Sequence, residues 1–268
     1  MTRVRLDQLL VDRGLAPSRA AAQALLLAGE VDLAGAGSRT LKPGQLVDPD
    51  VGLSVVARDR WASRAGAKLE AALDAFAISP SGYACLDAGA STGGFTDCLL
   101  QAGAAHVVAV DVGRGQLAWS LRTDPRVTVL ERTNVRHLTP DDIGGRVDLC
   151  TADLSFISLT VCAPALARCT TGAADLVLLV KPQFEAGRSD VGKGGVVRDA
   201  SVHRSVLRRV RDGLAAEGID AVAAMPSPLR GADGNVEFFF HARTDGPPTL
   251  GDDALDAAVD RAHTGARS

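Results

Sequence analysis

Apolar and polar positions follow two kinds of pattern along residues 83–244 of this chain. Short apolar runs, typical of strands buried on both faces, alternate with stretches whose apolar residues recur every three or four positions, as in helices. Strands are predicted at 84–90, 106–112, 127–132, 147–154 and 174–181, and helices at 94–103, 115–124 and 156–169. This alternation predicts an α/β fold, a doubly wound parallel sheet that binds ligands beyond the carboxyl ends of its strands.

The last part of the chain adds a long helix and two strands. Residues 202–218 have helical spacing and end at Gly218, and residues 220–228 and 235–244 are expected to close the sheet as a hairpin-like edge pair. Residues 245–268 are expected to form a tail with a short amphipathic helix followed by disorder. The main domain is therefore predicted to span residues 65–244.

The first 57 residues read as a separate small domain, followed by a linker at 58–64. Leu6, Leu9 and Leu10 have helical spacing, and a second helix is expected to begin at Ser18, its N-cap, and to end at Gly29. Two short strands at 30–35 and 52–57 follow, with a turn at 42–45 between them.

Charge is distributed unevenly over this 268-residue chain, whose net charge is −3. Residues 1–64 carry nine Lys/Arg and seven Asp/Glu, which leaves −5 for the rest. The N-terminal part is thus the better candidate for contact with a polyanion. Two interpretations stay open: a small helical cap on the larger domain, or a module that uses Arg3, Arg5, Arg13 and Arg19 as phosphate contacts.

The five cysteines and the overall composition favour a soluble cytoplasmic protein. The cysteines are odd in number, match no zinc spacing and lie mostly in apolar runs, so reduced thiols are expected and a metal is not. No stretch reaches the roughly 20 apolar residues of a membrane span, and no signal peptide is evident. A monomer is favoured.

A glycine-rich loop, "LDAGASTGGFTD" at 86–97, follows the first strand of the main domain. Its glycines allow close backbone approach to a ligand, and the amides of the next helix point toward that position. The G-x-x-x-G-G spacing and a carboxylate at Asp87 favour S-adenosylmethionine over NAD, because Asp87 can meet the amino group of the methionine part. The expected contacts in this loop are Asp87, Gly89, Ser91, Thr92, Gly93, Gly94 and Phe95.

Polar residues at the ends of later strands extend this predicted cofactor site. Asp111 follows the second strand, where doubly wound folds hold an acidic residue for ribose hydroxyls, and Asn134 is a candidate contact on the adenine side. Asp153 and Lys181 end the fourth and fifth strands and should lie side by side near the cofactor. Lys68 and Glu237 lie on a helix and a strand where surface charges are equally compatible with the pattern.

Several of these segments resemble a known family. "RLDQLL" and "SRAAAQALLLAGEV" resemble the S4 RNA-binding domain, and "LDAGASTGGFTD", "ADLSFISL", "LVKPQFE" and "GNVEFF" are similar to motifs of the TlyA (haemolysin A) family of ribosomal RNA 2'-O-methyltransferases, whose catalytic domain is of the FtsJ type. The resemblance covers residues 3–243. One departure is Ala65 after Ser63 and Arg64, where the family has glycine, here displaced to Gly66.

The resemblance implies a Rossmann-like class I methyltransferase that uses S-adenosylmethionine, with Lys68, Asp153, Lys181 and Glu237 as its catalytic tetrad. It implies cytidine targets in 16S and 23S ribosomal RNA within the 30S and 50S subunits, with the S4 domain helping to seat the ribosomal substrate. Arg64 is a further candidate RNA contact. The rival classes are a membrane-acting haemolysin, a non-catalytic RNA-binding protein, an NAD dehydrogenase and a pseudouridine synthase, none of which accounts for the loop and the tetrad together.

Lys181 is the expected general base, and its surroundings act in both directions. A lysine can accept a proton only in its neutral form, which the apolar strand behind it, Lys68 and the sulfonium of the cofactor favour. Asp153 and Glu237 favour the charged form instead. The carboxylates are expected to hold the lysines in place and to orient the hydroxyl.

Overall fold

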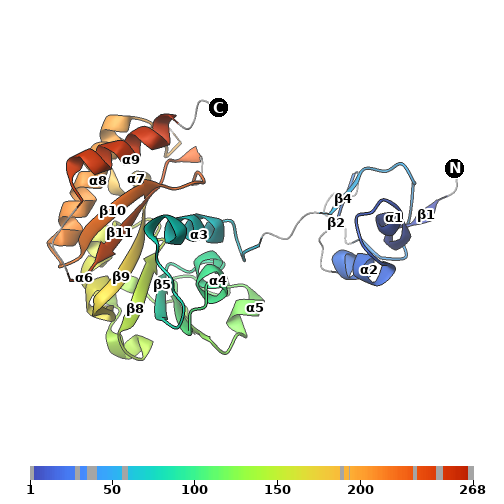
Figure 1. The fold of residues 1–268 in the computed structure, drawn as a ribbon, viewed down its shortest axis with the longest axis horizontal. Coiled ribbons are helices and arrows are strands. Elements are labelled where there is room, and N and C mark those ends of the chain that lie inside the picture. Colours follow the sequence, from blue (N-terminus) through green and yellow to red (C-terminus); the bar gives the residue numbers. More distant parts are fainter. Residues whose placement is uncertain are drawn as a thin grey trace. The chain divides into compact units, whose positions relative to one another are not determined.

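The computed structural model divides the chain into two compact units, Met1–Arg60 and Trp61–Ser268 (Figure 1). Each unit has its own apolar core and is described separately. The structure describes residues 3–27, 31–34, 41–55, 60–187, 190–192, 194–231, 234–245 and 250–264.

In its described residues, the first unit has two helices and two small antiparallel strand pairs. Helix α1 (Leu6–Asp12) and helix α2 (Arg19–Leu27) pack over a core that includes Leu6 and Leu10. The predicted helices are confirmed, and Ser18 Oγ accepts a hydrogen bond from the amide of Ala21 as an N-cap does. The predicted end of the second helix at Gly29 lies outside the described residues.

The strand pairs of this unit are short. Strands β2 (Val31–Leu33) and β4 (Leu53–Val55) confirm the two predicted strands, and the structure pairs them with each other. Strands β1 (Val4–Arg5) and β3 (Leu46–Val47) form a second pair that the sequence does not indicate, since two residues are too few to show a period.

The second unit is built on a seven-stranded sheet with the order β10-β11-β9-β8-β5-β6-β7. Five strands are parallel, and β11 runs antiparallel to both β9 and β10, so the predicted doubly wound sheet with a closing pair is confirmed. The strands are β5 (Ala84–Ala88), β6 (His106–Val110), β7 (Val127–Leu130), β8 (Val147–Ala152), β9 (Thr170–Val180), β10 (Asp220–Pro226) and β11 (Phe238–Arg243).

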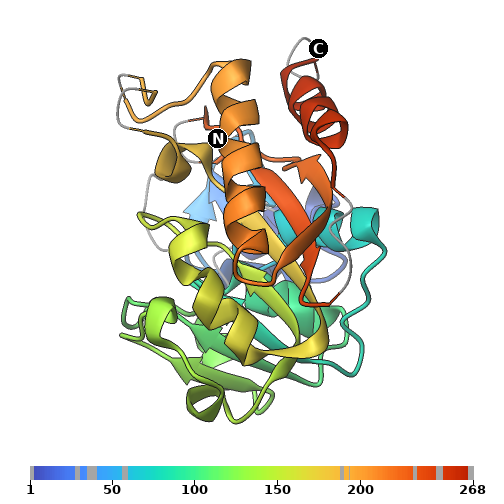
Figure 2. The same ribbon diagram turned by 90° about the vertical axis from the view of Figure 1, so that its left-hand side faces the viewer.

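Helices cover both faces of this sheet, so consecutive residues of its central strands are buried, as in β5 and most of β11. Phe238 and Phe240 pack in the core under α6, α8 and α9, whereas Phe239 packs in the opposite core under α3, α4 and α5 (Figures 1 and 2). The helices are α3 (Ala65–Phe76), α4 (Gly94–Gln101), α5 (Trp119–Arg122), α6 (Leu159–Cys169), α7 (Pro182–Glu185), α8 (Ala200–Ala215) and α9 (Asp252–Thr264). Two 3₁₀ helices lie at Val135–His137 and Pro140–Ile143.

Two predicted helices are shorter than the apolar pattern suggests. The helix expected at 115–124 is only α5, because Gly115 has a positive φ and its amide donates to the carboxylate of Glu131 at 2.6 Å. The helix expected at 156–169 begins at Leu159, since Ser158 is its N-cap. Local polar contacts therefore override the apolar period at both helix starts.

The boundary between the units differs from the predicted linker at 58–64. Trp61 is 7% exposed and packs in the core under α3, and the amide of Ala62 donates to Asp97 Oδ2 at 2.7 Å. Residues 61–64 are thus part of the second unit, and residues 56–59 lie outside the described residues.

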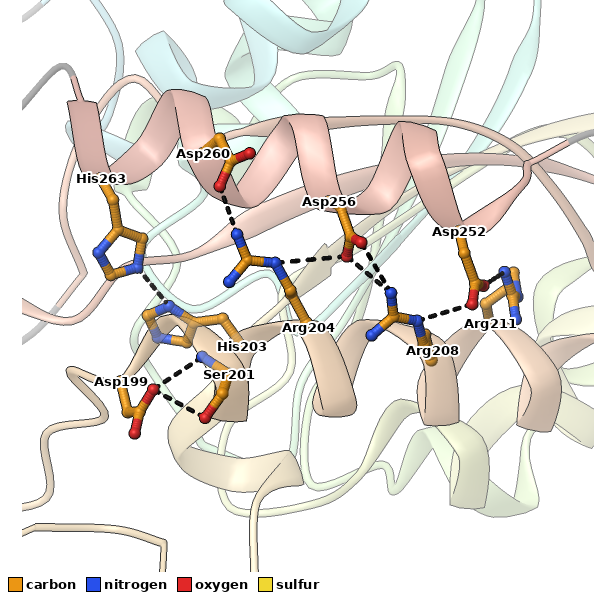
Figure 3. A network of polar contacts seen from close by, with 10 residues as sticks. All are labelled: Asp199, Ser201, His203, Arg204, Arg208, Arg211, Asp252, Asp256, Asp260 and His263. Carbon is orange, nitrogen blue, oxygen red and sulfur yellow. Dashed lines mark hydrogen bonds and ion pairs between the residues drawn. The ribbon is translucent and has the colours of Figure 1, made fainter.

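The predicted C-terminal tail is also part of the second unit. Helix α9 buries Leu255, Ala258 and Val259 against the sheet domain. Its outer edge faces α8 through a ladder of ion pairs between three aspartates and three arginines (Figure 3). Arg208 joins two rungs of this ladder, with Asp252 at 2.9 Å and Asp256 at 2.8 Å. The expectation of disorder falls on residues 265–268, outside the described residues.

No helix within the described ranges is long and apolar enough to cross a membrane. All five cysteines are buried free thiols.

Because α9 belongs to the core, Leu255→Ala should destabilise the second unit by about 2–5 kcal/mol, the usual cost of a buried Leu→Ala substitution. Chemical unfolding followed by circular dichroism measures this loss. Asp253→Asn, on the exposed side of the same helix, serves as the control and should change the free energy of unfolding by less than about 1 kcal/mol. Equal stabilities for Leu255→Ala and the wild type would show that α9 does not contribute to the fold.

Candidate functional site

Two adjoining cavities lie beyond the carboxyl ends of the parallel strands. The larger holds about 320 Å³ and the smaller about 90 Å³, and both are lined by Gly89, Ser91 and Asp153. Asp111, Asn134 and Phe156 line the larger cavity, and Ser63, Thr92, Gly94 and Phe95 line the smaller. The cavities therefore meet beside Asp153, at the place where parallel sheets bind ligands.

The glycine-rich loop shapes this junction. Gly89 has a φ of 89°, and a Cβ there would lie 2.5 Å from the carbonyl oxygen of Asp153. A Cβ on Gly94, the first residue of α4, would collide with Ser63 Oγ. Gly93 also has a positive φ, but it faces Leu117 and Leu121 and lines neither cavity. The loop needs its glycines for backbone shape and close packing.

Asp111 and Asn134 lie where the sequence predicts them. The carboxylate of Asp111 accepts hydrogen bonds from the amides of Ser91 at 2.8 Å and Gly113 at 2.7 Å. Asn134 accepts from the amide of Arg136 at 3.1 Å and so begins the 3₁₀ helix behind it. Both side chains are thereby fixed at the wall of the larger cavity.

Asp87 does not reach either cavity. Its side chain is completely buried, where Oδ2 accepts from Thr96 Oγ1 at 2.6 Å and Oδ1 from Thr151 Oγ1 at 3.4 Å. Burial raises the pKa of Asp87 to about 7. The expectation that this carboxylate meets a cofactor amino group is therefore at odds with the structure, in which Asp87 joins β5 to α4 and β8.

Lys181 forms an ion pair with Asp153 at the end of the two neighbouring strands β8 and β9. Lys181 Nζ lies 2.5 Å from Asp153 Oδ1 and donates to Ser155 Oγ at 3.0 Å. Both side chains of the pair are largely buried, with 12% and 18% of their surfaces exposed. The predicted proximity of Asp153 and Lys181 is confirmed.

Lys68 and Glu237 form a second, more deeply buried pair. Lys68 Nζ lies 2.6 Å from Glu237 Oε2, and the two side chains are 7% and 3% exposed. Glu237 Oε1 packs so closely on Gly231 that a Cβ there would collide with it. The interpretation of Lys68 and Glu237 as solvated surface charges is wrong.

Strand register brings the two pairs to the same edge and the same face of the sheet. Phe238 pairs with Val180, so the preceding Glu237 lies across from the following Lys181. Val180 and Phe238 pack under α6 and α8, and because side chains alternate, Lys181 and Glu237 belong to the face covered by α3, which carries Lys68.

The sequence indicates some residues of this site only indirectly. Ser155, which holds Lys181, and Phe156 both follow the end of β8 in "DLSFISL". Phe156 is 89% exposed at the rim of the larger cavity, has a φ of 65°, and its ring lies 4.9 Å from that of Phe184. A polar and aromatic run directly after an apolar strand is the signal that could have identified them.

Two of the predicted RNA-contacting arginines converge in the first unit. Arg5 and Arg19 both bind the buried carboxylate of Asp7, at 2.9 and 3.3 Å, and their own side chains are about half exposed. These hydrogen bonds hold the pKa of Asp7 well below its usual range. Arg13 lies elsewhere, bound to the carbonyl groups of Pro49 and Val51. Arg3 and Arg64 are exposed, the latter in the second unit.

The buried Asp87 should make stability depend on pH. Because its pKa is raised in the folded protein, Asp87 keeps a proton there between about pH 5 and 7 that the unfolded chain releases. The stability of the wild type relative to Asp87→Asn should thus fall as pH rises through this window, by up to about 1.4 kcal/mol per pH unit. Urea unfolding of both proteins at several pH values measures the difference. A constant difference would mean that Asp87 titrates normally.

Comparison with known proteins agrees with this geometry. Residues 61–244 match the model of the FtsJ-like methyltransferases. A protein of Mycobacterium tuberculosis (strain H37Rv), described as 16S/23S rRNA (cytidine-2'-O)-methyltransferase TlyA, is 54% identical over 97% of each chain. Hemolysin A of Brachyspira hyodysenteriae is 40% identical over 89% of this chain and 99% of its own.

Solved structures show the same relationship. One from Streptococcus thermophilus that carries a hemolysin label has a TM-score of 0.75 and 40% identity, and the match covers 98% of this chain and 97% of the other. An S-adenosylmethionine-dependent methyltransferase fold from Listeria monocytogenes, at 16% identity and a TM-score of 0.50, covers 67% of this chain and 99% of its own and supports the Rossmann-like fold alone. The chain belongs to the TlyA (haemolysin A) family of FtsJ-like methyltransferases.

Proposed function

We propose that this protein transfers a methyl group from S-adenosylmethionine to the 2'-hydroxyl of cytidine in ribosomal RNA, with targets in the 16S and 23S RNAs of the 30S and 50S subunits. The observation that carries the proposal is that two lysine–carboxylate pairs lie at one edge and on one face of the sheet, and that Asp153 of one pair lines both cavities. The name of the relative with 54% identity supports the choice of substrate. Because its proposed substrates are ribosomal subunits, we expect the protein to act in the cytoplasm. We also expect it to act as a monomer.

The residues that line the cavities suit S-adenosylmethionine. Asp111 is fixed by two amides with oxygen lone pairs left for ribose hydroxyls, and Asn134 stands on the side expected for adenine. In the smaller cavity, Ser63, Thr92 and the amino end of α4 suit the polar end of the methionine part. When bound, the cofactor supplies a methyl group activated by a positive sulfur.

Lys181 is the residue we assign to remove the proton of the 2'-hydroxyl. Asp153 and Ser155 fix its Nζ at the cavity junction, so the amine can meet a hydroxyl that enters there. Lys68, fixed by Glu237, supplies a positive charge and a hydrogen-bond donor for the 2'-oxygen as negative charge develops on that oxygen.

Features outside the tetrad suit an RNA substrate. The exposed ring of Phe156 at the rim of the cavity offers a surface on which an unstacked base can lie. We assign the first unit to the S4 type of RNA-binding domain. In this unit, the guanidinium groups of Arg5 and Arg19 both bind the carboxylate of Asp7. This leaves a net positive charge for a phosphate of the RNA backbone.

The proposed base is tested by methyl transfer from labelled S-adenosylmethionine to isolated 30S and 50S subunits that lack the modification. Label should appear in RNA with the wild type, and Lys181→Ala should lower the rate by about 10²–10⁴-fold with cofactor affinity little changed. Lys181→Arg keeps the charge but cannot act as a base, so it should be equally slow. Label in protein instead of RNA, or undiminished activity in Lys181→Ala, would contradict the proposal.

The proposed phosphate contacts are tested by the affinity for ribosomal subunits at several salt concentrations. Arg5→Ala and Arg19→Ala should each weaken binding and reduce the slope of log affinity against log salt by about one, while the affinity for S-adenosylmethionine stays unchanged. Arg126→Ala, which removes a similarly exposed arginine from the second unit, serves as the control. An unchanged salt slope in a variant that carries both Arg5→Ala and Arg19→Ala would exclude these arginines as phosphate contacts.

A further inference from the structure

The short helix α7 begins directly after Lys181 and ends at Glu185, a carboxylate that takes no part in the proposed chemistry. The side chain of Glu185 is largely buried, and both of its oxygens are bonded. Oε2 accepts from Ser158 Oγ at 2.6 Å, and Oε1 accepts from the amide of Leu159 at 2.8 Å. Burial raises the pKa of Glu185, and the hydrogen bonds from Ser158 and Leu159 act in the opposite direction.

Glu185 and Lys181 hold the two ends of one loop. Residues 153–158 connect β8 to α6, and Lys181 contacts the start of this loop at Asp153 and Ser155. Glu185 contacts its end at Ser158. One turn of chain after β9 therefore fixes the whole segment that lines the larger cavity.

The loop needs such support because its middle is strained. Phe156 has a φ of 65°, a left-handed conformation that costs about 1–2 kcal/mol for a residue with a side chain. The ring of Phe184, also on α7, packs 4.9 Å from that of Phe156. Arg209 on α8 donates a hydrogen bond to the carbonyl oxygen of Glu185, which anchors α7 in turn. The strained conformation is thus held from one side by α7.

We propose that Glu185 is a positioning residue for methyl transfer: by capping α6 it fixes the 153–158 loop, so that Asp153 and Ser155 hold Lys181 Nζ at the cavity junction. The proposal rests on the function proposed above. A carboxylate that served only to cap α6 would add to stability without affecting Lys181, and this difference separates the two roles.

The test compares Glu185→Ala with Glu185→Gln in the full chain, using the subunit assay above. Glu185→Ala should lower kcat by about 10–100-fold, since small displacements of reacting groups have effects of that order. Glu185→Gln should restore kcat to within about threefold, because its amide oxygen can accept from Leu159 N and its NH₂ can donate to Ser158 Oγ. Glu217→Ala, at an exposed position two residues after α8, is the matched control and should behave as the wild type.

A second measurement does not depend on RNA. The chain has four lysines, so the NMR signals of the Lys181 side chain can be assigned by substitution. They should move in Glu185→Ala and stay in place in Glu185→Gln. If the wild type itself does not label ribosomal RNA, the proposed function fails, and the NMR comparison still decides the role of Glu185.

Three results would overturn the inference. The first is a wild-type kcat in Glu185→Ala, and the second is unmoved Lys181 signals in that variant. The third is a loss of kcat that only matches the fraction of unfolded protein, measured by thermal melting at the assay temperature. The last result would reduce Glu185 to a helix cap.

Discussion

A charge can be buried in a protein only beside a partner, and this constraint organises the edge of the sheet that carries the candidate site. Lys68 and Glu237 are almost completely buried, and each would be strongly unfavourable without the other. Their contact joins α3, before the first strand of the domain, to the residue that precedes β11. Segments 169 residues apart in the chain thus meet at one ion pair. Lys181 and Asp153 form the second pair on the same face.

The same constraint separates two aspartates that look equivalent in the sequence. Asp87 lies near the end of β5, and Asp111 directly follows the neighbouring strand β6. Asp87 points into the domain, where burial raises its pKa and two threonines satisfy its oxygens. Asp111 points to the cavity and is fixed by backbone amides. Asp87 supports the glycine-rich loop from inside the domain, while Asp111 faces the larger cavity.

A third buried carboxylate organises the N-terminal unit. Asp7 has no exposed surface, and its partners are two guanidinium groups and the amide of Gln23. The guanidinium groups remain about half exposed, so the unit presents positive charge that is already ordered. Because these arginine side chains are ordered before binding, they lose less conformational entropy when they contact RNA.

The sequence by itself determined the α/β class, the order of strands and helices, the glycine loop and the proximity of Asp153 to Lys181, because apolar period and strand-end position are local properties. The resemblance of its motifs also indicated the family. Only the tertiary structure decided that Lys68 meets Glu237, that Asp87 is buried and that α9 belongs to the core. Each of these depends on contacts between segments far apart in the chain, as Lys68 and Glu237 are by 169 residues. A local pattern cannot specify which distant side chain will satisfy a buried charge.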